Sequence, residues 1–353
     1  MIVLGIETSC DETSASIVKL NDNKIEILSN VILSQDIHKI FGGVYPEQAF
    51  RKHQENIIEI LKQATKDIFI REIDLIGVTA YPGLLGALAS GVAVAKTIAK
   101  ILNKPIIPVN HLWGHLLVNF KSIEQNYANK KYLGLVISGG HTNSYILESL
   151  IPLKIRKLSS TLDDAVGEAF DKAARVLNLG FPGGPIIDEL AKNYQKKNPE
   201  KIKEIRPIFP VPNPSDYNFS YSGLKTALIR YIKKNPDFDA EEICFHFQYS
   251  AVKHIINKLE LILREIKVDG ILVGGGVAAN SFLRNELAKI QDKYGVEILI
   301  PEPVLCTDNA AMIAIASIFI HLSYPNIPED FDIYPSEEEG LLENYIIDTP
   351  NKI

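Results

Sequence analysis

The sequence predicts an α/β protein of two lobes with a cleft between them. Its 353 residues correspond to about two domains at roughly 100–200 residues each. Strand-like apolar runs alternate with helical segments, which is typical of α/β folds. A strand, a polar turn and a second strand open each half: the first pair of strands is expected at 2–6 and 15–20, the second at 132–137 and 144–147. The return of this unit hints at a duplicated architecture.

The other elements follow in order along the chain. In the first half we expect helices at 47–69 and 84–102 and buried parallel strands at 75–79 and 106–109. In the second half we expect short strands at 271–273 and 298–300 and helices at 163–177, 186–196, 222–233, 240–266 and 281–294. Residues 196–221 are rich in Lys, Pro and Asn and predict an irregular surface excursion.

These elements suggest the following domain bounds. The first lobe is expected at 1–110 and the second at 111–325, with an insertion near 185–225 and a last helix that can return to the first lobe. Prolines and an acidic run after Pro325 predict that 326–353 is a loosely packed tail.

Composition indicates a folded cytoplasmic protein. Hydrophobic residues make up 46% and charged residues 23%, far from the profile of a disordered chain. The N-terminus has no basic region of the signal-peptide type, and the longest uncharged stretch, at 82–95, is too short to span a membrane. The three cysteines lie far apart without a Cys-x-x-Cys pair, which fits a reducing compartment.

The net charge of −6 gives the whole molecule no attraction to nucleic acid, so RNA binding requires a local basic patch. A solvated helix face explains the best candidate cluster equally well. That cluster consists of Lys192, Lys196, Lys197, Lys201, Lys203 and Arg206.

The sharpest local signal for chemistry is the pair His111 and His115. Two histidines four residues apart share one face of a helix and can bind one metal ion, although the two histidines could equally well just cap the helix that follows Asn110. A zincin protease would need a glutamate after the first histidine, where this chain has Leu112. A third ligand is usually a carboxylate, for which Asp308 is the candidate; alternatively Asp308 only caps the helix that follows it.

Glycine-rich turns and an acidic segment suggest nucleotide binding. The turns are at 138–140, 182–184 and 274–276, and the first and third directly follow predicted strands. Each alone is more often a simple tight turn, and neither the dinucleotide fingerprint nor the Walker A pattern is present. In the acidic segment, Asp163 and Asp164 suit a helix start, whereas Glu168 and Asp171 share a face and one of them can reach a ribose hydroxyl or an amine.

Taken together, these segments resemble the TsaD (also called Gcp or YgjD) family of threonylcarbamoyl transferases over roughly residues 1–320. The matching pieces appear in the family's order: GIETSCDET at 5–13, GGV at 42–44, NHLWGH at 110–115, SGGHT at 138–142, GEAFDK at 167–172, PGGP at 182–185, FSYSGLKT at 219–226, GGGVAAN at 274–280 and CTDN at 306–309.

The resemblance implies a two-lobed actin-like (ASKHA) fold of duplicated ribonuclease-H-like domains with a nucleotide in the cleft. It implies that one Fe²⁺ or Zn²⁺ per subunit is held by His111, His115 and Asp308. The family's substrate positions fall on Val136, Ile137, Ser138, Gly139, Gly140, Asp171, Gly184, Asp188 and Asn280.

The implied reaction moves a threonylcarbamoyl group from threonylcarbamoyl-AMP to the exocyclic amine of the adenosine 3′ of the anticodon, in tRNAs reading codons that begin with A. Candidate groups for the proton transfer are Asp11, Glu12 and His141. The resemblance further implies binding of ATP or ADP, partners of the TsaB and TsaE type, and an adenylate supplied by a TsaC-type enzyme.

One position departs from the family pattern, and another distinguishes the family's branches. Tyr81 stands where many relatives have the first glycine of Gly-Pro-Gly-Leu. Val136 stands where the archaeal and eukaryotic branch has a tyrosine ligand, so the chain resembles the bacterial form.

Three alternatives compete with the transferase. An actin-like kinase or ATPase explains the glycine turns but leaves the histidine pair without a role. An inert binding module of the same fold would lack those histidines. A metallopeptidase is disfavoured by Leu112.

Overall fold

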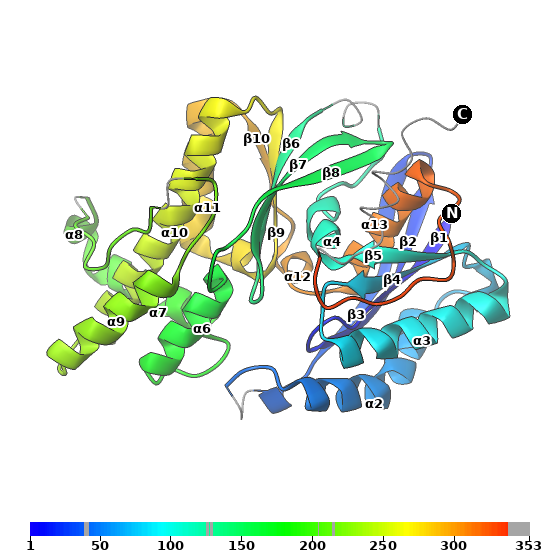
Figure 1. Ribbon diagram of the computed structural model, residues 1–353, viewed down its shortest axis with the longest axis horizontal. Helices are drawn as coiled ribbons and strands as arrows, with labels where there is room; N and C mark the ends of the chain where they lie inside the picture. The colour runs from blue at the N-terminus through cyan, green and yellow to red at the C-terminus, as the bar shows by residue number, and fades with distance from the viewer. Residues whose placement is uncertain (39–41, 125–126, 128–129, 204, 214–215, 338–353) are drawn as a thin grey trace. The chain divides into compact units, whose positions relative to one another are not determined.

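The computed structural model describes residues 1–38, 42–124, 127, 130–203, 205–213 and 216–337 (Figure 1). The chain divides into two compact units. Unit 1 contains 1–130, 147–155 and the described residues from 307 onward. Unit 2 contains 131–146 and 156–306.

The sheet of unit 1 has the strand order β3-β2-β1-β4-β5. These strands are β1 Ile2–Glu7, β2 Glu12–Asn21, β3 Lys24–Ser34, β4 Leu75–Tyr81 and β5 Ile106–Asn110. β1, β2 and β3 pair antiparallel, whereas β4 and β5 run parallel to β1. Every residue of β4 and β5 is buried, as expected of strands covered on both faces.

Helices cover the two faces of this sheet. α2 (Pro46–Ala64) and α3 (Leu85–Leu102) pack together on one face, and α13 (Ala310–Ser323) lies on the other, next to the short α4 (His111–Leu117) (Figure 1). A Cβ at Gly77 would overlap the Ser317 hydroxyl, and one at Gly5 would overlap the backbone of Ala310. The two glycines therefore let α13 lie directly against β1 and β4.

Within the described residues, α3 is the one helix that is long and apolar enough to span a membrane by length and composition. Its buried side chains, among them Ala87, Leu88 and Ala95, lie within unit 1, where α3 packs against β4 and α2. Of this helix, 39% is buried, which is the burial of a helix with one face on a sheet.

Unit 2 repeats the strand order of unit 1. Its sheet has the order β10-β9-β6-β7-β8. The first three strands of unit 2, β6, β7 and β8, lie in sequence from the centre to one edge, as β1, β2 and β3 do in unit 1, and the last two strands lie on the other side of the central strand in both sheets. The strands are β6 Tyr132–Ile137, β7 Thr142–Leu150, β8 Leu153–Ser159, β9 Gly270–Gly274 and β10 Glu297–Leu299. The expected α/β class and the duplication are confirmed.

The core of unit 2 joins β6 to a set of helices. Leu133, Leu135 and Ile137 of β6 belong to one buried apolar cluster with residues of α6, α9, α10 and α11. The helical elements of this unit are α6 Val166–Val176, α7 Gly183–Lys197, α8 Pro199–Lys203, α9 Ser222–Lys234, α10 Ala240–Glu265, η2 Gly276–Ala279, α11 Ser281–Tyr294 and α12 Pro303–Cys306.

Three segment predictions are corrected. The helix expected at 47–69 ends at Ala64, and a separate 3₁₀ turn, η1, follows at Ile70–Glu72. The helix expected at 163–177 begins only at Val166. The segment 196–221 is not only a surface excursion, because Phe209 and Phe219 are buried in the core of unit 2.

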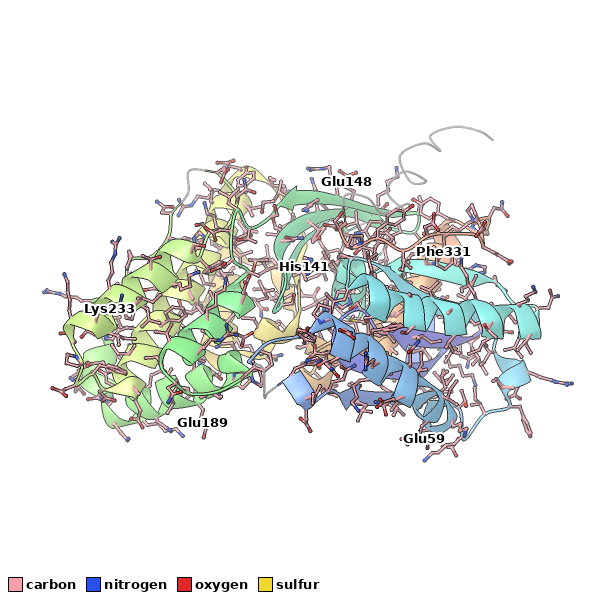
Figure 2. The ribbon with its side chains drawn as sticks, turned by 60° about the horizontal axis from the view of Figure 1, so that its bottom comes forward. Glu59, His141, Glu148, Glu189, Lys233 and Phe331 are labelled. Carbon is pink, nitrogen blue, oxygen red and sulfur yellow. The ribbon has the colours of Figure 1, made fainter. Side chains whose placement is uncertain are left out.

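The predicted loose tail is also wrong for 325–337. Phe331 is buried, and the ammonium of Lys96 on α3 lies 4.5 Å from the centre of its ring (Figure 2). The backbone N–H of Tyr334 donates to the carbonyl of Ala80, 3.1 Å away. This stretch is thus anchored to unit 1, while 338–353 lie outside the described residues.

The units differ from the expected lobes in one further respect. Residues 111–130 lie in unit 1, because α4 follows β5 directly and packs on α13. α13 itself also lies in unit 1.

The contact between α13 and the sheet gives a first prediction. Replacing Gly77 with Ala should lower the free energy of unfolding by about 1–3 kcal/mol, because the added methyl group overlaps Ser317 on α13. Urea unfolding measures the change. Gly223→Ala is the control, because a Cβ there has no atom within 4 Å. Equal stability of Gly77→Ala and the wild type would contradict the tight fit.

Candidate functional site

The histidine pair lies on α4, whose start is fixed by the residue before it. The Asn110 side chain accepts a hydrogen bond from the N–H of Leu112 at 2.9 Å and so caps the helix. All seven residues of α4 are buried. One helical turn separates His111 from His115, and their ring centres are 4.8 Å apart.

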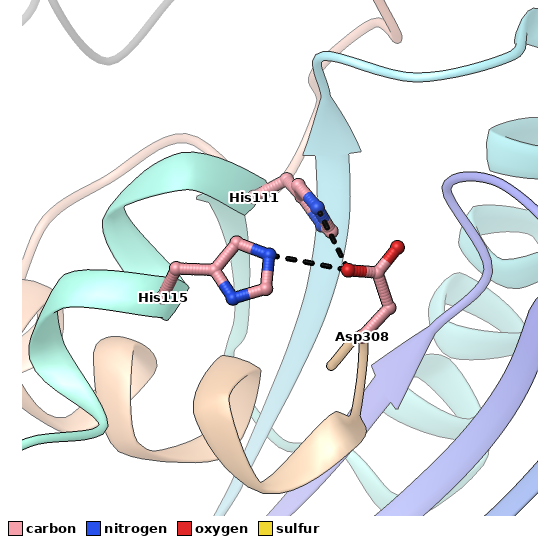
Figure 3. A group of neighbouring side chains, drawn as sticks. All are labelled: His111, His115 and Asp308. Carbon is pink, nitrogen blue, oxygen red and sulfur yellow. Dashed lines mark hydrogen bonds and ion pairs between the residues drawn. The ribbon is translucent and has the colours of Figure 1, made fainter. Parts of the chain in front are cut away.

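Asp308 comes from the loop between α12 and α13. The cap of α13 is Asn309, whose side chain accepts from the N–H of Met312 at 3.1 Å. The alternative role considered for Asp308, as the cap of this helix, is therefore taken by its neighbour. Asp308 points instead at the histidines (Figure 3).

The three side chains converge on one point. Oδ1 of Asp308 lies 3.1 Å from Nε2 of His115 and 3.5 Å from Nε2 of His111. One donor atom from each residue lies within 4.8 Å of the others. Two ligands that each lie about 2.1 Å from a tetrahedral or octahedral ion are about 3.0–3.4 Å apart, so the separations from Asp308 suit a shared metal ion.

The electrostatics of the cluster favour a cation. Burial alone would lower the pKa of His111, but the carboxylates of Asp308 and Glu7 outweigh it and raise that pKa well above its usual value. Burial would raise the pKa of Asp308, yet both histidines hold it far below its usual range. Among the described residues, Nδ1 of His115 is buried without a hydrogen-bond partner.

This donor set fits the expected metal. Two imidazoles and one carboxylate, with further positions left for other ligands, are typical of Fe²⁺ and Zn²⁺ sites. A divalent ion would also replace the proton that the two carboxylates draw to His111.

Of the candidate proton-transfer groups, two lie in unit 1 with the histidines. Asp11 is in the turn between β1 and β2, and Glu12 begins β2. Burial, followed by the charges of Asp308 and Asp11, raises the pKa of Glu12 well above its usual value. His141 belongs to unit 2, in the turn between β6 and β7.

The expected substrate positions all lie in unit 2, and several gather at one turn. Val136 and Ile137 end β6 with buried side chains, so only their backbone can meet a ligand. Gly139 and Gly140 are exposed, and a Cβ on either would have no atom within 4 Å. The Ser138 carbonyl accepts from the N–H of Gly167, which joins this turn to the start of α6.

The remaining positions gather around the start of α7. Asp171 accepts from the N–H of Gly183 at 2.7 Å, and Gly184 is the next residue of that helix. Asp188, one turn further along, accepts from the Ser281 hydroxyl at 2.8 Å. Asn280 precedes Ser281 and caps α11 through the N–H of Leu283. The structure thus brings Gly184, Asp188 and Asn280 into one neighbourhood.

The other acidic residues of this region have structural contacts. Asp163 accepts from the N–H groups of Tyr221 and Ser222 at the start of α9. Asp164 forms ion pairs with Lys172 and Lys225. Because these contacts hold Asp163 and Asp164 outside the helix, α6 begins only at Val166 and not at residue 163 as expected.

Three of the six basic residues of the candidate RNA patch lie next to carboxylates. Lys192 pairs with Asp188 on its own helix, and Lys197 pairs with Glu241 at the start of α10. Lys201 lies 4.0 Å from Glu242. These contacts favour the solvated helix face over an RNA surface at this place.

Sequence reasoning assigned no role to Glu7 or Gln248. Glu7 ends β1, is fully buried and contacts Nδ1 of His111 at 3.0 Å. Gln248 is a buried residue of α10 that accepts from the Asn280 side chain at 2.7 Å. The one signal for Glu7 was a charge that directly follows an apolar strand.

Comparisons of the sequence with known proteins point to one family. The family model described as tRNA N6-adenosine threonylcarbamoyltransferase matches residues 26–315. A curated relative of that name from Thermosipho africanus is 46% identical over 321 residues, 90% of this chain and 93% of the relative.

Solved structures are similar at the level of the fold. HypF of T. kodakarensis matches 92% of the chain with a TM-score of 0.61 at 13% identity, and the chain spans about half of HypF (47%). The (R)-2-hydroxyglutaryl-CoA dehydratase component A of Acidaminococcus fermentans matches 90% of this chain and 99% of its own with a TM-score of 0.51 at 16% identity. The fold is therefore of the actin-like ASKHA class.

The convergence of three ligands predicts metal binding that depends on Asp308. Replacing a residue that only hydrogen-bonds to a metal ligand typically weakens metal binding by roughly 10–100-fold. Asp308→Ala should weaken zinc binding by more than that, because it removes a ligand itself. Metal content after dialysis and a competition titration with a chelating dye measure this. Asp292→Ala, at an exposed acidic residue of α11, should bind like the wild type. Undiminished binding by Asp308→Ala would exclude this centre.

Proposed function

The chain belongs to the tRNA N6-adenosine threonylcarbamoyltransferase family, and we propose that it performs the reaction of that name. The threonylcarbamoyl group passes from threonylcarbamoyl-AMP to the exocyclic amine of the adenosine 3′ of the anticodon, in tRNAs reading codons that begin with A. The observation that carries the proposal is the convergence of His111, His115 and Asp308 in a chain that matches the family over most of its length.

The reaction is an acyl transfer. The amine nitrogen attacks the carbamoyl carbonyl carbon, the bond from that carbon to the AMP phosphate oxygen breaks, and AMP leaves. The nitrogen loses one proton to a base. The protein must therefore hold the nucleotide, stabilise the negative charge that grows on oxygen, and accept a proton.

His111, His115 and Asp308 would hold one Fe²⁺ or Zn²⁺ per subunit. When bound, such an ion supplies a Lewis acid for an oxygen of the substrate.

The adenylate would be held by residues of unit 2. The open backbone at Gly139 and Gly140 suits a phosphate, because no side chain shields their N–H groups. Asp171, Asp188 and Asn280 supply polar atoms near the start of α7 and α11 for hydroxyl and base contacts, as does the backbone of Gly184. The same positions would accept ATP or ADP.

Asp11, Glu12 and His141 are the candidate bases. Burial, followed by the charges of Asp308 and Asp11, raises the pKa of Glu12 above its usual value.

Partners of the TsaB and TsaE type, an adenylate from a TsaC-type enzyme and a cytoplasmic location complete the proposal. They rest on the family resemblance, and the three free cysteines are consistent with a reducing compartment. The kinase alternative leaves the histidine–aspartate cluster without a role, and the peptidase alternative lacks the glutamate that it needs at the position of Leu112.

A reconstituted assay tests the function. Purified protein, its pathway partners, ATP, threonine, bicarbonate and unmodified tRNA should yield threonylcarbamoyladenosine, detected in digested tRNA by mass spectrometry. His111→Ala should reduce the product by at least about 100-fold because a metal ligand is lost. His321→Ala, on α13 and outside the cluster, is the matched control. No product from the wild type, despite bound metal and nucleotide, would instead favour an actin-like ATPase.

A further inference from the structure

Glu7 is a buried anion placed behind a predicted metal ligand. It is the last residue of β1, and its side chain is fully buried. Oε1 accepts from the N–H of Ser9 at 2.5 Å, and Oε2 accepts from the Thr79 hydroxyl at 2.6 Å. These two donors, one from the turn after β1 and one from β4, fix the plane of the carboxylate.

The same Oε2 lies 3.0 Å from Nδ1 of His111. An ionised carboxylate only accepts hydrogen bonds, so Nδ1 must carry the proton in this contact. Both oxygens of Glu7 already accept hydrogen bonds, from the N–H of Ser9 and from the Thr79 hydroxyl, which is the arrangement of an ionised carboxylate. The Ser9 hydroxyl, 3.2 Å from Nδ1, is a weaker second neighbour.

With its proton on Nδ1, a neutral His111 presents a bare Nε2. That atom is the one that faces Asp308, 3.5 Å away. Two acceptors at this distance repel each other unless a proton or a cation lies between them. His115 has no such support, because its Nδ1 has no partner among the described residues.

We propose that Glu7 is a positioning residue, which holds His111 in the Nδ1–H tautomer with Nε2 directed at the metal. The inference rests on the metal centre of the proposed function and adds Glu7 as a residue that contacts the ligand His111 and not the metal. Carboxylates that accept from a ligating histidine orient the ring and raise its basicity. Thr79 and Ser9 act one step further back, by holding Glu7.

Glu7→Gln separates this role from simple packing. If the nitrogen of the new side-chain amide faces His111, Nδ1 must become an acceptor, and the proton moves to Nε2, where it blocks metal binding. If that nitrogen faces the N–H of Ser9 instead, two donors oppose each other at the distance of the lost hydrogen bond. Neither orientation restores the native arrangement.

The test is zinc affinity of the full-length protein, measured by chelator competition, together with ¹⁵N NMR of the histidine rings in the zinc-loaded form. Glu7→Gln should bind zinc about 10–100-fold more weakly and lose the exchange-protected Nδ1 proton of His111. Glu59→Gln, at an exposed glutamate of α2 (Figure 2), should match the wild type in both readouts. Thermal unfolding followed by circular dichroism checks that the variants fold.

If Glu7→Gln does not fold, the zinc affinity of Thr79→Val tests the positioning role instead. It removes the hydroxyl that holds Oε2 and should weaken zinc binding several-fold. Wild-type affinity in the folded variants, or a wild-type protein whose His111 carries its proton on Nε2, would overturn the positioning role and leave the proposed transferase intact. A wild-type protein that binds no zinc or iron would overturn the metal centre and this inference together.

Discussion

The contact between α13 and the sheet of unit 1 determines the geometry of the candidate metal centre. Gly5 and Gly77 let the helix lie against β1 and β4, and Gly114 of α4 lets the same helix pass close by, since a Cβ there would lie 3.1 Å from the Ile313 side chain. Asp308 directly precedes this helix, and His111 begins α4. Residues that are far apart in the sequence therefore meet because two helices are packed together through glycines.

Charge is the second constraint on this region. Glu7 is fully buried beside His111, Asp308 is partly exposed and contacts both histidines, and the charge of Asp308 also acts on Glu12. Buried charges of one sign are costly unless a cation or a proton compensates them. The charges of Asp308 and Glu7 raise the pKa of His111 against the effect of burial, whereas the pKa of Glu12 is raised by burial first and then by the charges of Asp308 and Asp11. A divalent ion held by the three candidate ligands would offset part of this negative charge.

Local features were predictable from the sequence, whereas contacts between distant segments were not. The placement of His111 and His115 on one helix face follows from helical periodicity alone. Asp308 could be named as a candidate carboxylate, but no local pattern links it to a helix nearly two hundred residues earlier, so its contact with the histidines is visible only in the structure. The late start of α6 depends on Asp163 bonding to the start of α9, which single-sequence periodicity does not register. The burial of Phe331 was likewise hidden in a stretch rich in proline and acidic residues.

The division of the chain has a consequence for synthesis on the ribosome. Unit 2 is contained in 131–306, apart from the strand residues 147–155, whereas unit 1 needs segments from both ends of the chain. α4 emerges early, but Asp308 and α13 emerge only with the last part of the polypeptide. The sheet of unit 1 must therefore wait with one face uncovered while unit 2 is completed. A nascent chain that stalls before residue 308 would contain both histidines but not Asp308, so the candidate metal site is complete only when the last part of the polypeptide has emerged.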